Sequence, residues 1–259
     1  MSLYICQHLG LGDHFICSGL IRVLHKRLGV NRTFVYAEKS KMATVEALYS
    51  DTKGLIKPAQ LPLDFTATAA NREKLKHAIH NAHNGSRYLE IGFKPIGKYA
   101  GASFDDAFYY QSGIDFKHKW SSFVMPSEFI DPAPVKQNIA FVHDDEIRDF
   151  VIEDKFIGNK NIVRPISGKY DNLLTWLPTI QAASEIHCID SSFINLIDLL
   201  DESKIPMCHE GNLFFHKYSR GASPSATPHL LKRWRVVSVP PFGVLLTTQR
   251  KKAELDFQI

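Results

Sequence analysis

The stretch LYICQHLGLGDHFICSGLIRVLHKRL, residues 3–28, predicts that the chain opens as an α/β protein. Residues 3–7 form a short apolar run typical of a strand, and residues 8–12 form a tight loop that carries two glycines. From Asp13 onward, apolar residues recur at helical spacing, at Phe15, Ile16, Leu20, Val23, Leu24 and Leu28. Asp13 stands where a helix N-cap is expected, so its carboxylate can accept backbone N–H bonds there.

The loop at residues 8–12 is also a candidate ligand site. A strand that runs into a helix N-terminus is the usual ligand position in an open parallel sheet, and Gly10 and Gly12 let the backbone turn sharply. Phe15 breaks the dinucleotide fingerprint G-x-G-x-x-G, and no Gly-Lys-Ser/Thr follows to make a P-loop. Because Asp13 is negative, the loop suits a hydroxyl better than a phosphate. That Asp13 merely caps the helix remains the alternative.

The remaining chain alternates strands and helices in both halves. In the first half we expect strands at residues 33–37, 54–57 (ended by Pro58) and 88–91, and helices at residues 41–49 and 71–84. In the second half we expect strands at residues 138–142, 161–164, 185–189, 205–208 and 235–239, and helices at residues 173–183 and 192–200. Repeated strand–helix units of this length predict parallel sheets covered by helices.

A proline-rich segment separates the two halves. The segment MPSEFIDPAPVKQ, residues 125–137, contains three prolines, which oppose both a helix and a central strand. We therefore expect a domain over residues 1–130, a second domain over residues 131–240, and a ligand cleft between them.

Composition limits the function classes. The chain has 259 residues, of which 44% are hydrophobic and 22% charged, as in an ordinary globular protein. A net charge of +4 gives no reason to expect nucleic acid as a partner. Four cysteines in apolar runs, without C-x-x-C spacing, predict reduced thiols in a cytoplasmic protein. No signal peptide and no apolar run near about 18 residues are found, so we expect no transmembrane segment and at most peripheral membrane contact.

Polar residues gather after two expected strands of the second half. The segment IAFVHDDEIR, residues 139–148, brings His143, Asp144, Asp145 and Arg148 to a strand end. The segment IVRPISGKY follows, and in it two cations can reach an anion, Arg164 and Lys169.

The segment EIHCIDSSFINLIDLL, residues 185–200, opens a helix with Asp190, Ser191 and Ser192. Hydroxyls and free N–H groups at a helix start suit a diphosphate. Asp190 is better placed to hold the turn or a sugar hydroxyl. Simple N-capping by the serines is the alternative.

These motifs resemble the GT-B glycosyltransferases, especially the heptosyltransferase-like group of lipopolysaccharide and capsule synthesis. In that group a Gly-x-Gly-Asp loop follows the first strand, as GLGDH does here, and an Asp-Ser/Thr-Gly/Ser motif opens a late helix, as IDSSFINL does. Residues 104–126 also resemble a stretch of related sugar transferases. The resemblance implies two Rossmann-like domains with a cleft between them, and a tail, residues 241–259, that packs back toward the first domain.

The resemblance also implies roles for individual residues. Asp13 would be the general base on the acceptor hydroxyl, and Arg148 would match the basic residue that faces the donor phosphates. Residues 190–192 would match the donor-binding helix start, with Asn195 where the group has a histidine.

Other candidates come from the residues themselves. Arg164 and Lys169 complete the expected donor set. The candidate acceptor contacts are Gly12, the loop-flanking His8 and His14, and Trp120, whose ring could stack on a sugar or lie buried.

We therefore expect an inverting, metal-independent glycosyltransferase that moves a sugar from a nucleotide-activated donor to a hydroxyl of a glycan or glycolipid. Arg side chains and helix N–H groups can stabilise the leaving diphosphate, so neither a metal nor a cofactor beyond the donor is expected. One alternative is a metal-dependent GT-A-type enzyme that uses Asp144 and Asp145. The other is a sugar-nucleotide-binding α/β protein without catalysis, which would have no need of Asp13 at a cleft.

Overall fold

The structure of the protein is a computed structural model. The structure describes residues 1–8, 10–63, 65–93, 103–145, 150–166, 171–202, 205–209, 211–217, 229–230, 233–238 and 244–245. The chain divides into two compact units, each built on its own parallel sheet. Unit 1 is made of Met1–Ile130, Asp171–Leu174 and Ser225–His229. Unit 2 is made of Asp131–Tyr170, Thr175–Pro224 and Leu230–Ile259.

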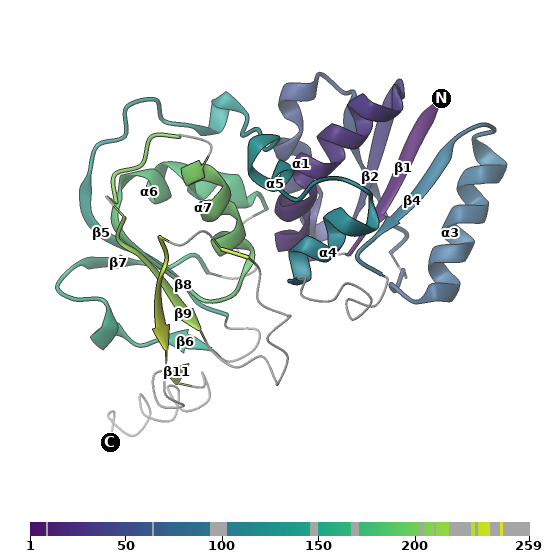
Figure 1. Ribbon diagram of the computed structural model, residues 1–259. Coiled ribbons are helices and arrows are strands. Elements are labelled where there is room, and N and C mark those ends of the chain that lie inside the picture. The colour runs from purple at the N-terminus through teal and green to yellow at the C-terminus, as the bar shows by residue number, and fades with distance from the viewer. Residues whose placement is uncertain are drawn as a thin grey trace. The chain divides into compact units, whose positions relative to one another are not determined.

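Unit 1 has a four-stranded parallel sheet in the order β3-β2-β1-β4. Its strands are β1 (Ser2–Gln7), β2 (Arg32–Ala37), β3 (Ile56–Gln60) and β4 (Arg87–Ile91). Its helices are α1 (Leu11–Leu28), α2 (Met42–Leu48), α3 (Ala69–Ala82), α4 (Phe104–Gln111) and α5 (His118–Ser121), with 3-10 turns at Lys39–Lys41, Ser50–Thr52 and Ser127–Phe129. Figure 1 shows α3 on one face of this sheet and α1, α4 and α5 on the other.

Apolar side chains from both faces of β1 build the core of unit 1. Tyr4 and Cys6 pack with Ile79 of α3, while Leu3 and Ile5 are fully buried on the opposite face. Helix α1 also meets α5 closely, because a Cβ at Gly19 would lie only 2.0 Å from the carbonyl oxygen of His118. This close approach explains why residues of α1 outside its apolar face, such as Ser18 and Gly19, are also buried.

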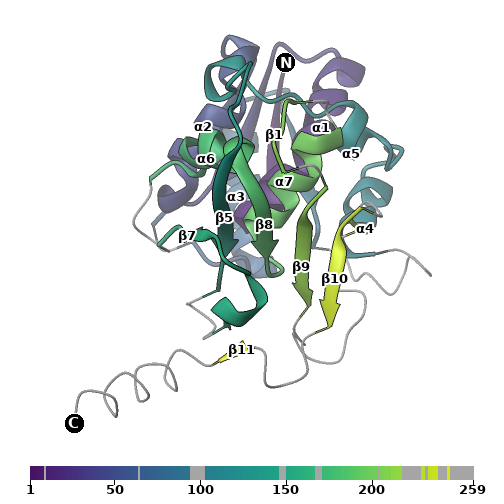
Figure 2. The same ribbon diagram turned by 90° about the vertical axis from the view of Figure 1, so that its left-hand side faces the viewer.

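Unit 2 has a five-stranded parallel sheet in the order β10-β9-β8-β5-β7, and a two-stranded antiparallel pair of β11 and β6. Figure 2 shows the strands of the larger sheet side by side, pointing the same way. The strands are β5 (Gln137–His143), β6 (Val151–Ile152), β7 (Asn161–Val163), β8 (Ala183–Cys188), β9 (Leu213–Lys217), β10 (Arg235–Ser238) and β11 (Val244–Leu245). The helices are α6 (Leu177–Ala182) and α7 (Ser192–Glu202), and a 3-10 turn lies at Asp154–Phe156. A further 3-10 turn, Leu173–Trp176, begins in unit 1 and ends in unit 2.

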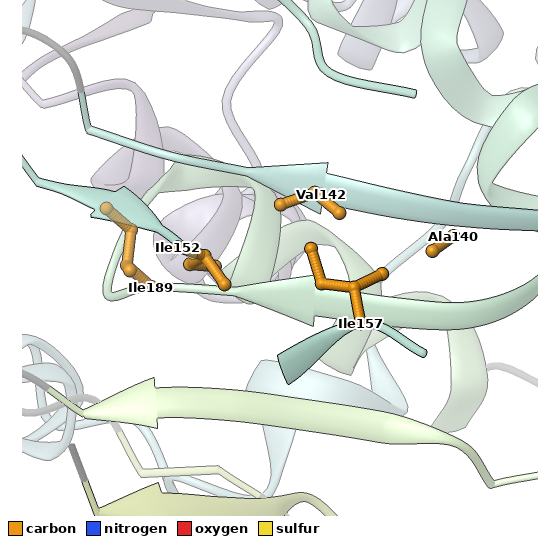
Figure 3. Close-up of a cluster of buried hydrophobic side chains, with 5 residues drawn as sticks. All are labelled: Ala140, Val142, Ile152, Ile157 and Ile189. Atoms are coloured by element: carbon orange, nitrogen blue, oxygen red, sulfur yellow. The ribbon is translucent and has the colours of Figure 1, made fainter. Parts of the chain in front are cut away.

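The two faces of β5 fill different parts of the unit 2 core. One face belongs to a buried aliphatic cluster that Figure 3 shows, made of Ala140, Val142, Ile152, Ile157 and Ile189. On the other face, Phe141 packs edge-on against Phe193 of α7, with ring centroids 5.2 Å apart. Burial on both faces is what a parallel sheet requires.

The structure confirms most of the expected elements and corrects three. Pro58 lies inside β3 instead of ending it, which is tolerated because β3 is an edge strand. The expected helix at residues 173–183 is a 3-10 turn followed by the short α6, and β8 already begins at Ala183.

The third correction is the expected strand at residues 205–208, which is wrong. The backbone N–H of Cys208 donates to the carbonyl oxygen of Gln181 at 2.8 Å, and the Gln181 side chain donates to the carbonyl of Pro206 at 2.9 Å. These bonds tie the segment to the end of α6, so its backbone groups do not join the sheet. The neighbour of β8 on the side away from β5 is β9, which was not among the expected strands.

His229 belongs to unit 1, and its backbone is hydrogen-bonded to a buried ion pair of that unit. Lys119 Nζ lies 2.7 Å from Asp105 Oδ2, and both side chains are fully buried. Lys119 also donates to the His229 carbonyl at 2.7 Å, while the His229 N–H donates to the Asp105 carboxylate.

In the tail, the described residues Val244 and Leu245 pair with β6 of unit 2, and residues 246–259 lie outside the described residues. None of the described helices is both long enough and apolar enough to cross a membrane.

Candidate active site at the strand ends

Each sheet has a switch point, where the chain leaves a central strand in opposite directions. In unit 1 the first strand, β1, lies between β2 and β4, and in unit 2 the first strand, β5, lies between β7 and β8. Ligands of open parallel sheets bind at the carboxyl ends of the strands beside such a point. The loops that follow β1 and β4, and those that follow β5 and β8, are therefore the candidate site of each unit.

Asp13 lies at the switch point of unit 1, but not as the N-cap. Helix α1 begins at Leu11 with Gly10 as its N-cap, so Asp13 is the third helical residue. Its Oδ2 accepts the Gly10 N–H at 3.0 Å, which satisfies a free donor of the helix start. A Cβ on Gly10 would lie 2.5 Å from that oxygen, so the glycine makes room for the carboxylate. A carboxylate in this first turn is also favoured by the helix dipole.

His8 is the immediate partner of Asp13. Its Nδ1 lies 2.9 Å from Asp13 Oδ2, and this hydrogen bond raises the pKa of His8 above its usual value, against the effect of partial burial. Three aromatic rings surround the imidazole, with centroids 5.7–6.4 Å away, those of Phe93, Phe104 and Phe108. These rings are not among the site residues predicted from the sequence, although the expected strand at residues 88–91 places Phe93 at the same sheet edge.

His14 has a different environment from His8, although both flank the same loop. Its side chain is fully buried, and its Nδ1 is hydrogen-bonded to the Gln7 amide nitrogen. Burial, helped by the charge of Lys41, lowers the pKa of His14 to about 3. The ring is therefore neutral and enclosed in the core of unit 1, and its acceptor role remains a prediction without surface access to support it.

The two other candidate acceptor contacts lie in helices. Gly12 is the second residue of α1. Trp120 lies in α5, where its half-buried ring packs against Phe116 at 5.1 Å and lies 4.9 Å from Lys119 Nζ. These are the contacts of a packed aromatic residue, and the structure does not test sugar stacking.

In unit 2 the start of α7 gathers unpaired polar atoms. Asn195 Nδ2 donates to the Ser191 carbonyl at 3.1 Å, and Ser192 is the first helical residue, two positions after Asp190. Ser191 Oγ and Asn195 Oδ1 are buried, and neither has a hydrogen-bond partner among the residues that the structure describes. Because buried polar atoms in proteins are usually paired, such a group suggests a place for a ligand.

His143 ends β5 directly beside this helix start. It is paired in register with Cys188, and its ring lies 4.5 Å from that of Phe193 in α7. Burial lowers the pKa of His143 to about 4, with Asp145 opposing the shift. Its buried Nδ1 likewise has no partner within the described part of the chain. A neutral imidazole therefore joins the polar atoms of α7 at the switch point.

Arg164, which follows β7, is held by carboxylates of its own unit. Its Nη1 lies 2.8 Å from Asp144 Oδ2, and its Nη2 lies 2.5 Å from Asp154 Oδ1. Asp144 Oδ1 in turn accepts the Ile152 N–H at 2.7 Å. The positive charge of Arg164 is thus balanced inside the protein, and its donor-binding role stays a prediction. The other two expected cations, Arg148 and Lys169, lie outside the described residues.

The acidic residues after β5 do not form a metal centre within the described residues. Both carboxylate oxygens of Asp144 are engaged, and Asp145 makes paired backbone hydrogen bonds with Phe150. Over the described ranges, no group of three histidine, cysteine or acidic side chains is arranged to hold a metal ion.

Comparison with known proteins identifies the fold. No protein-family model matches the sequence, and no curated protein matches it. Among solved structures, the fold is similar to that of the heptosyltransferase WaaC of E. coli with ADP-2-deoxy-2-fluoro heptose, at a TM-score of 0.50 and 11% identity, over 99% of this chain and 100% of that one. The same enzyme with ADP gives a TM-score of 0.51 and 10% identity, over 98% and 99% of the two chains. A family 9 glycosyltransferase of Veillonella parvula gives 0.55 and 8% identity, over 98% of this chain and 90% of that one.

The chain has the fold of these glycosyltransferases. The expected α/β class, with two Rossmann-like domains of the GT-B kind, is therefore confirmed. Two parallel sheets of this kind also argue against the GT-A alternative.

Proposed function

We propose that this chain is a glycosyltransferase that moves a sugar from a nucleotide-activated donor to a hydroxyl of a glycan or glycolipid acceptor. One observation carries the proposal. The fold matches sugar transferases over nearly the whole chain, and the switch points, where such a fold binds ligands, carry an acidic–imidazole pair in unit 1 and unpaired polar groups in unit 2.

The donor side of the proposal rests on unit 2. Free N–H groups at the start of α7, with Ser191, Ser192 and Asn195, suit the diphosphate of a nucleotide sugar. Arg148 and Lys169 would add positive charge, and Asp190 would hold a sugar hydroxyl. WaaC was solved with ADP and with an ADP-heptose analogue, so ADP-sugars are the first donors to test.

The acceptor side of the proposal rests on unit 1. Asp13, or its partner His8, takes the proton of the acceptor hydroxyl, and the oxygen forms a bond to the anomeric carbon of the sugar. The bond from that carbon to the diphosphate breaks, and the nucleoside diphosphate leaves with the electron pair. A single displacement of this kind inverts the anomeric configuration.

Four free cysteines, three of them buried, support the proposed cytoplasmic location.

Turnover should survive removal of divalent metal. Helix N–H groups and arginines would stabilise the leaving diphosphate, so a cation is not needed for that charge. We expect the transfer rate to be unchanged within about twofold when the enzyme is assayed in EDTA. Loss of turnover in chelator, restored by Mn²⁺ or Mg²⁺, would contradict this part of the proposal.

The function as a whole is tested by a screen of nucleotide sugars. A donor that binds the folded protein raises its melting temperature. At a donor concentration of 100 times Kd, binding adds about 2.7 kcal/mol to the free energy of unfolding. Donors that stabilise the protein are then assayed for transfer to acceptor glycans, with release of nucleoside diphosphate as the readout. Binding without any transfer would favour the non-catalytic alternative. A screen in which no nucleotide sugar stabilises the protein would refute both.

A further inference from the structure

The Asp13 carboxylate is poorly exposed for a group that must meet a substrate. Its side chain is 10% exposed, whereas that of His8 is 49% exposed. Both hydrogen bonds that the Asp13 carboxylate makes within the described residues fall on Oδ2, one from Gly10 and one from His8. Of this pair, the imidazole is the group that an incoming hydroxyl meets first.

The bond between the pair also fixes which ring nitrogen of His8 is free. An ionised carboxylate can only accept hydrogen bonds, so the 2.9 Å contact requires the proton on Nδ1. The lone pair of the neutral ring is then on Nε2. Among the residues that the structure describes, no side chain or backbone group is hydrogen-bonded to Nε2.

The surroundings of His8 favour this role. Phe104 and Phe108 come from α4, and Phe93 follows β4 and carries the Arg72 guanidinium 4.1 Å from its ring centre. Asp105 of α4 is paired with Lys119, so it does not compete with Asp13 for the His8 imidazole. The charged groups that act on His8 are Asp13, which favours the imidazolium, and Lys41, which opposes it.

We propose that Nε2 of His8 is the base that takes the proton of the acceptor hydroxyl, and that Asp13 positions the ring and stabilises the imidazolium formed. This inference rests on the proposed function and names its base. The acceptor O–H proton passes to Nε2, the oxygen bonds to the anomeric carbon, and the nucleoside diphosphate leaves. Asp13 keeps its negative charge throughout, so it is a positioning residue and His8 the catalytic residue.

Histidine also suits the chemistry at neutral pH. A general base works best when its pKa lies near the operating pH. Asp13 raises the pKa of His8 from its usual value of 6.5 toward that range. The three phenylalanine rings beside the imidazole give this half-exposed site an apolar side.

The tautomer can be measured without any activity assay. We expect nitrogen NMR of the histidine rings, with His8 assigned by its loss in His8→Asn, to show the proton of neutral His8 on Nδ1. The titration midpoint should lie above 6.5 and fall in Asp13→Asn, because the carboxylate that raises it is gone. A neutral His8 that carries its proton on Nε2 would overturn the proposal.

Two substitutions of His8 separate a base from a holder of Asp13. His8→Asn retains an N–H donor near the position of Nδ1 but has no group at Nε2, so turnover should fall by roughly 10²–10⁴. Added imidazole should restore part of the lost rate in His8→Ala. The control is His77→Asn on α3, whose histidine is 75% exposed and should leave turnover unchanged. A folded His8→Asn that keeps more than about a tenth of the wild-type turnover would assign the base to Asp13 itself.

The pH profile gives an independent readout. With His8 as the base, kcat/KM should fall on the acid side through a pKa above 6.5, and this limb should move to lower pH in Asp13→Asn. An acid limb that lies below pH 6.5, or that does not move in Asp13→Asn, would overturn this assignment. A wild-type protein that turns over no nucleotide sugar refutes the proposed function. An active wild type with an active His8→Asn refutes only the assignment of the base.

Discussion

At the scale of single residues, Asp13 shows that a capping role and a catalytic role are compatible. The same carboxylate oxygen accepts the Gly10 N–H and the His8 ring proton, so it orders the helix start and the imidazole together. From the sequence alone, the two roles are alternatives. The geometry removes that opposition, because one oxygen serves both partners and the glycine at position 10 leaves space for it.

Asp13→Asn should separate stability from turnover. The carboxamide oxygen can still accept the Gly10 N–H, so the free energy of unfolding should change by less than about 1 kcal/mol. The charge that supports the imidazolium is lost, so turnover should fall by roughly 10²–10⁴. Donor affinity should be unchanged, since the proposed donor contacts lie in unit 2. Thermal unfolding, a transfer assay and calorimetry on this one variant measure all three. A variant that keeps more than about a tenth of the rate would reduce Asp13 to a helix cap.

The two histidines of the first loop show where prediction from sequence ends at this scale. Both flank GLGD, and spacing alone gives them equal standing as acceptor contacts. Their difference comes from packing: His14 is fully buried within unit 1, whereas His8 stays half exposed among rings supplied by residues some 85–100 positions away. Local sequence contains no information about such distant partners.

At the scale of elements, the alternation of apolar strands and amphipathic helices predicts most of the fold. It fails where one residue overrides the pattern. Pro58 was expected to end a strand, but the edge position of β3 leaves its missing N–H without cost. The segment at residues 205–208 has strand-like composition, but the side chain and backbone of Gln181 take up its polar groups.

Gly19→Ala should destabilise the protein, although Gly→Ala in an ordinary helix interior stabilises by about 1 kcal/mol. The reason is the contact between α1 and α5, where the new Cβ would meet the His118 carbonyl oxygen at 2.0 Å. Because the obstacle is backbone, relief requires the helices to separate. We expect a loss of roughly 1–3 kcal/mol in urea denaturation. An unchanged or higher stability would mean that the two helices do not pack this closely.

The two arginines of the proposed donor set should respond differently. Arg164 is bound to Asp144 and Asp154, so Arg164→Ala should lower stability by removing the cation that faces the largely buried Asp144 carboxylate. Arg148→Ala should instead weaken donor binding by at least about tenfold, the value of a charged hydrogen bond to phosphate of about 1.5 kcal/mol or more. Calorimetry with donor and denaturation of both variants provide the comparison. Unchanged donor affinity in Arg148→Ala would remove that residue from the donor set.

At the scale of the whole molecule, the two units repeat one topological idea. Each sheet places its first strand in the interior and sends the chain to opposite sides of it, which creates one switch point in each unit. The loops at both points, after β1 and after β8, can be predicted from the sequence, because glycine, acidic and serine residues mark them. Which strand lies beside which depends on contacts between segments far apart in the chain, so the rings around His8 and the place of His143 beside α7 came only from the structure.

Buried histidines distributed over both units should make the molecule sensitive to acid. Burial lowers the pKa of His14 and His216 to about 3, and that of His143, His187 and His209 to about 4. Each is neutral in the folded state and, below about pH 6.5, binds a proton when the chain unfolds. The unfolded state therefore binds more protons, and the free energy of unfolding falls as the pH drops from 6.5 toward these values.

The expected slope is about 1.4 kcal/mol per pH unit for each proton bound on unfolding. His8 acts in the opposite direction, since its raised pKa adds stability at low pH that is lost as the pH rises through it, but it is one group against five. Urea denaturation at pH 7.5, 6.5 and 5.5 measures the slope. His14→Asn keeps an acceptor for the Gln7 amide and removes one titrating ring, so it should lower the slope by up to one proton. His77→Gln, on the exposed side of α3, should leave it unchanged. A free energy of unfolding that stays level or rises on acidification would mean that these histidines are not enclosed as the structure has them.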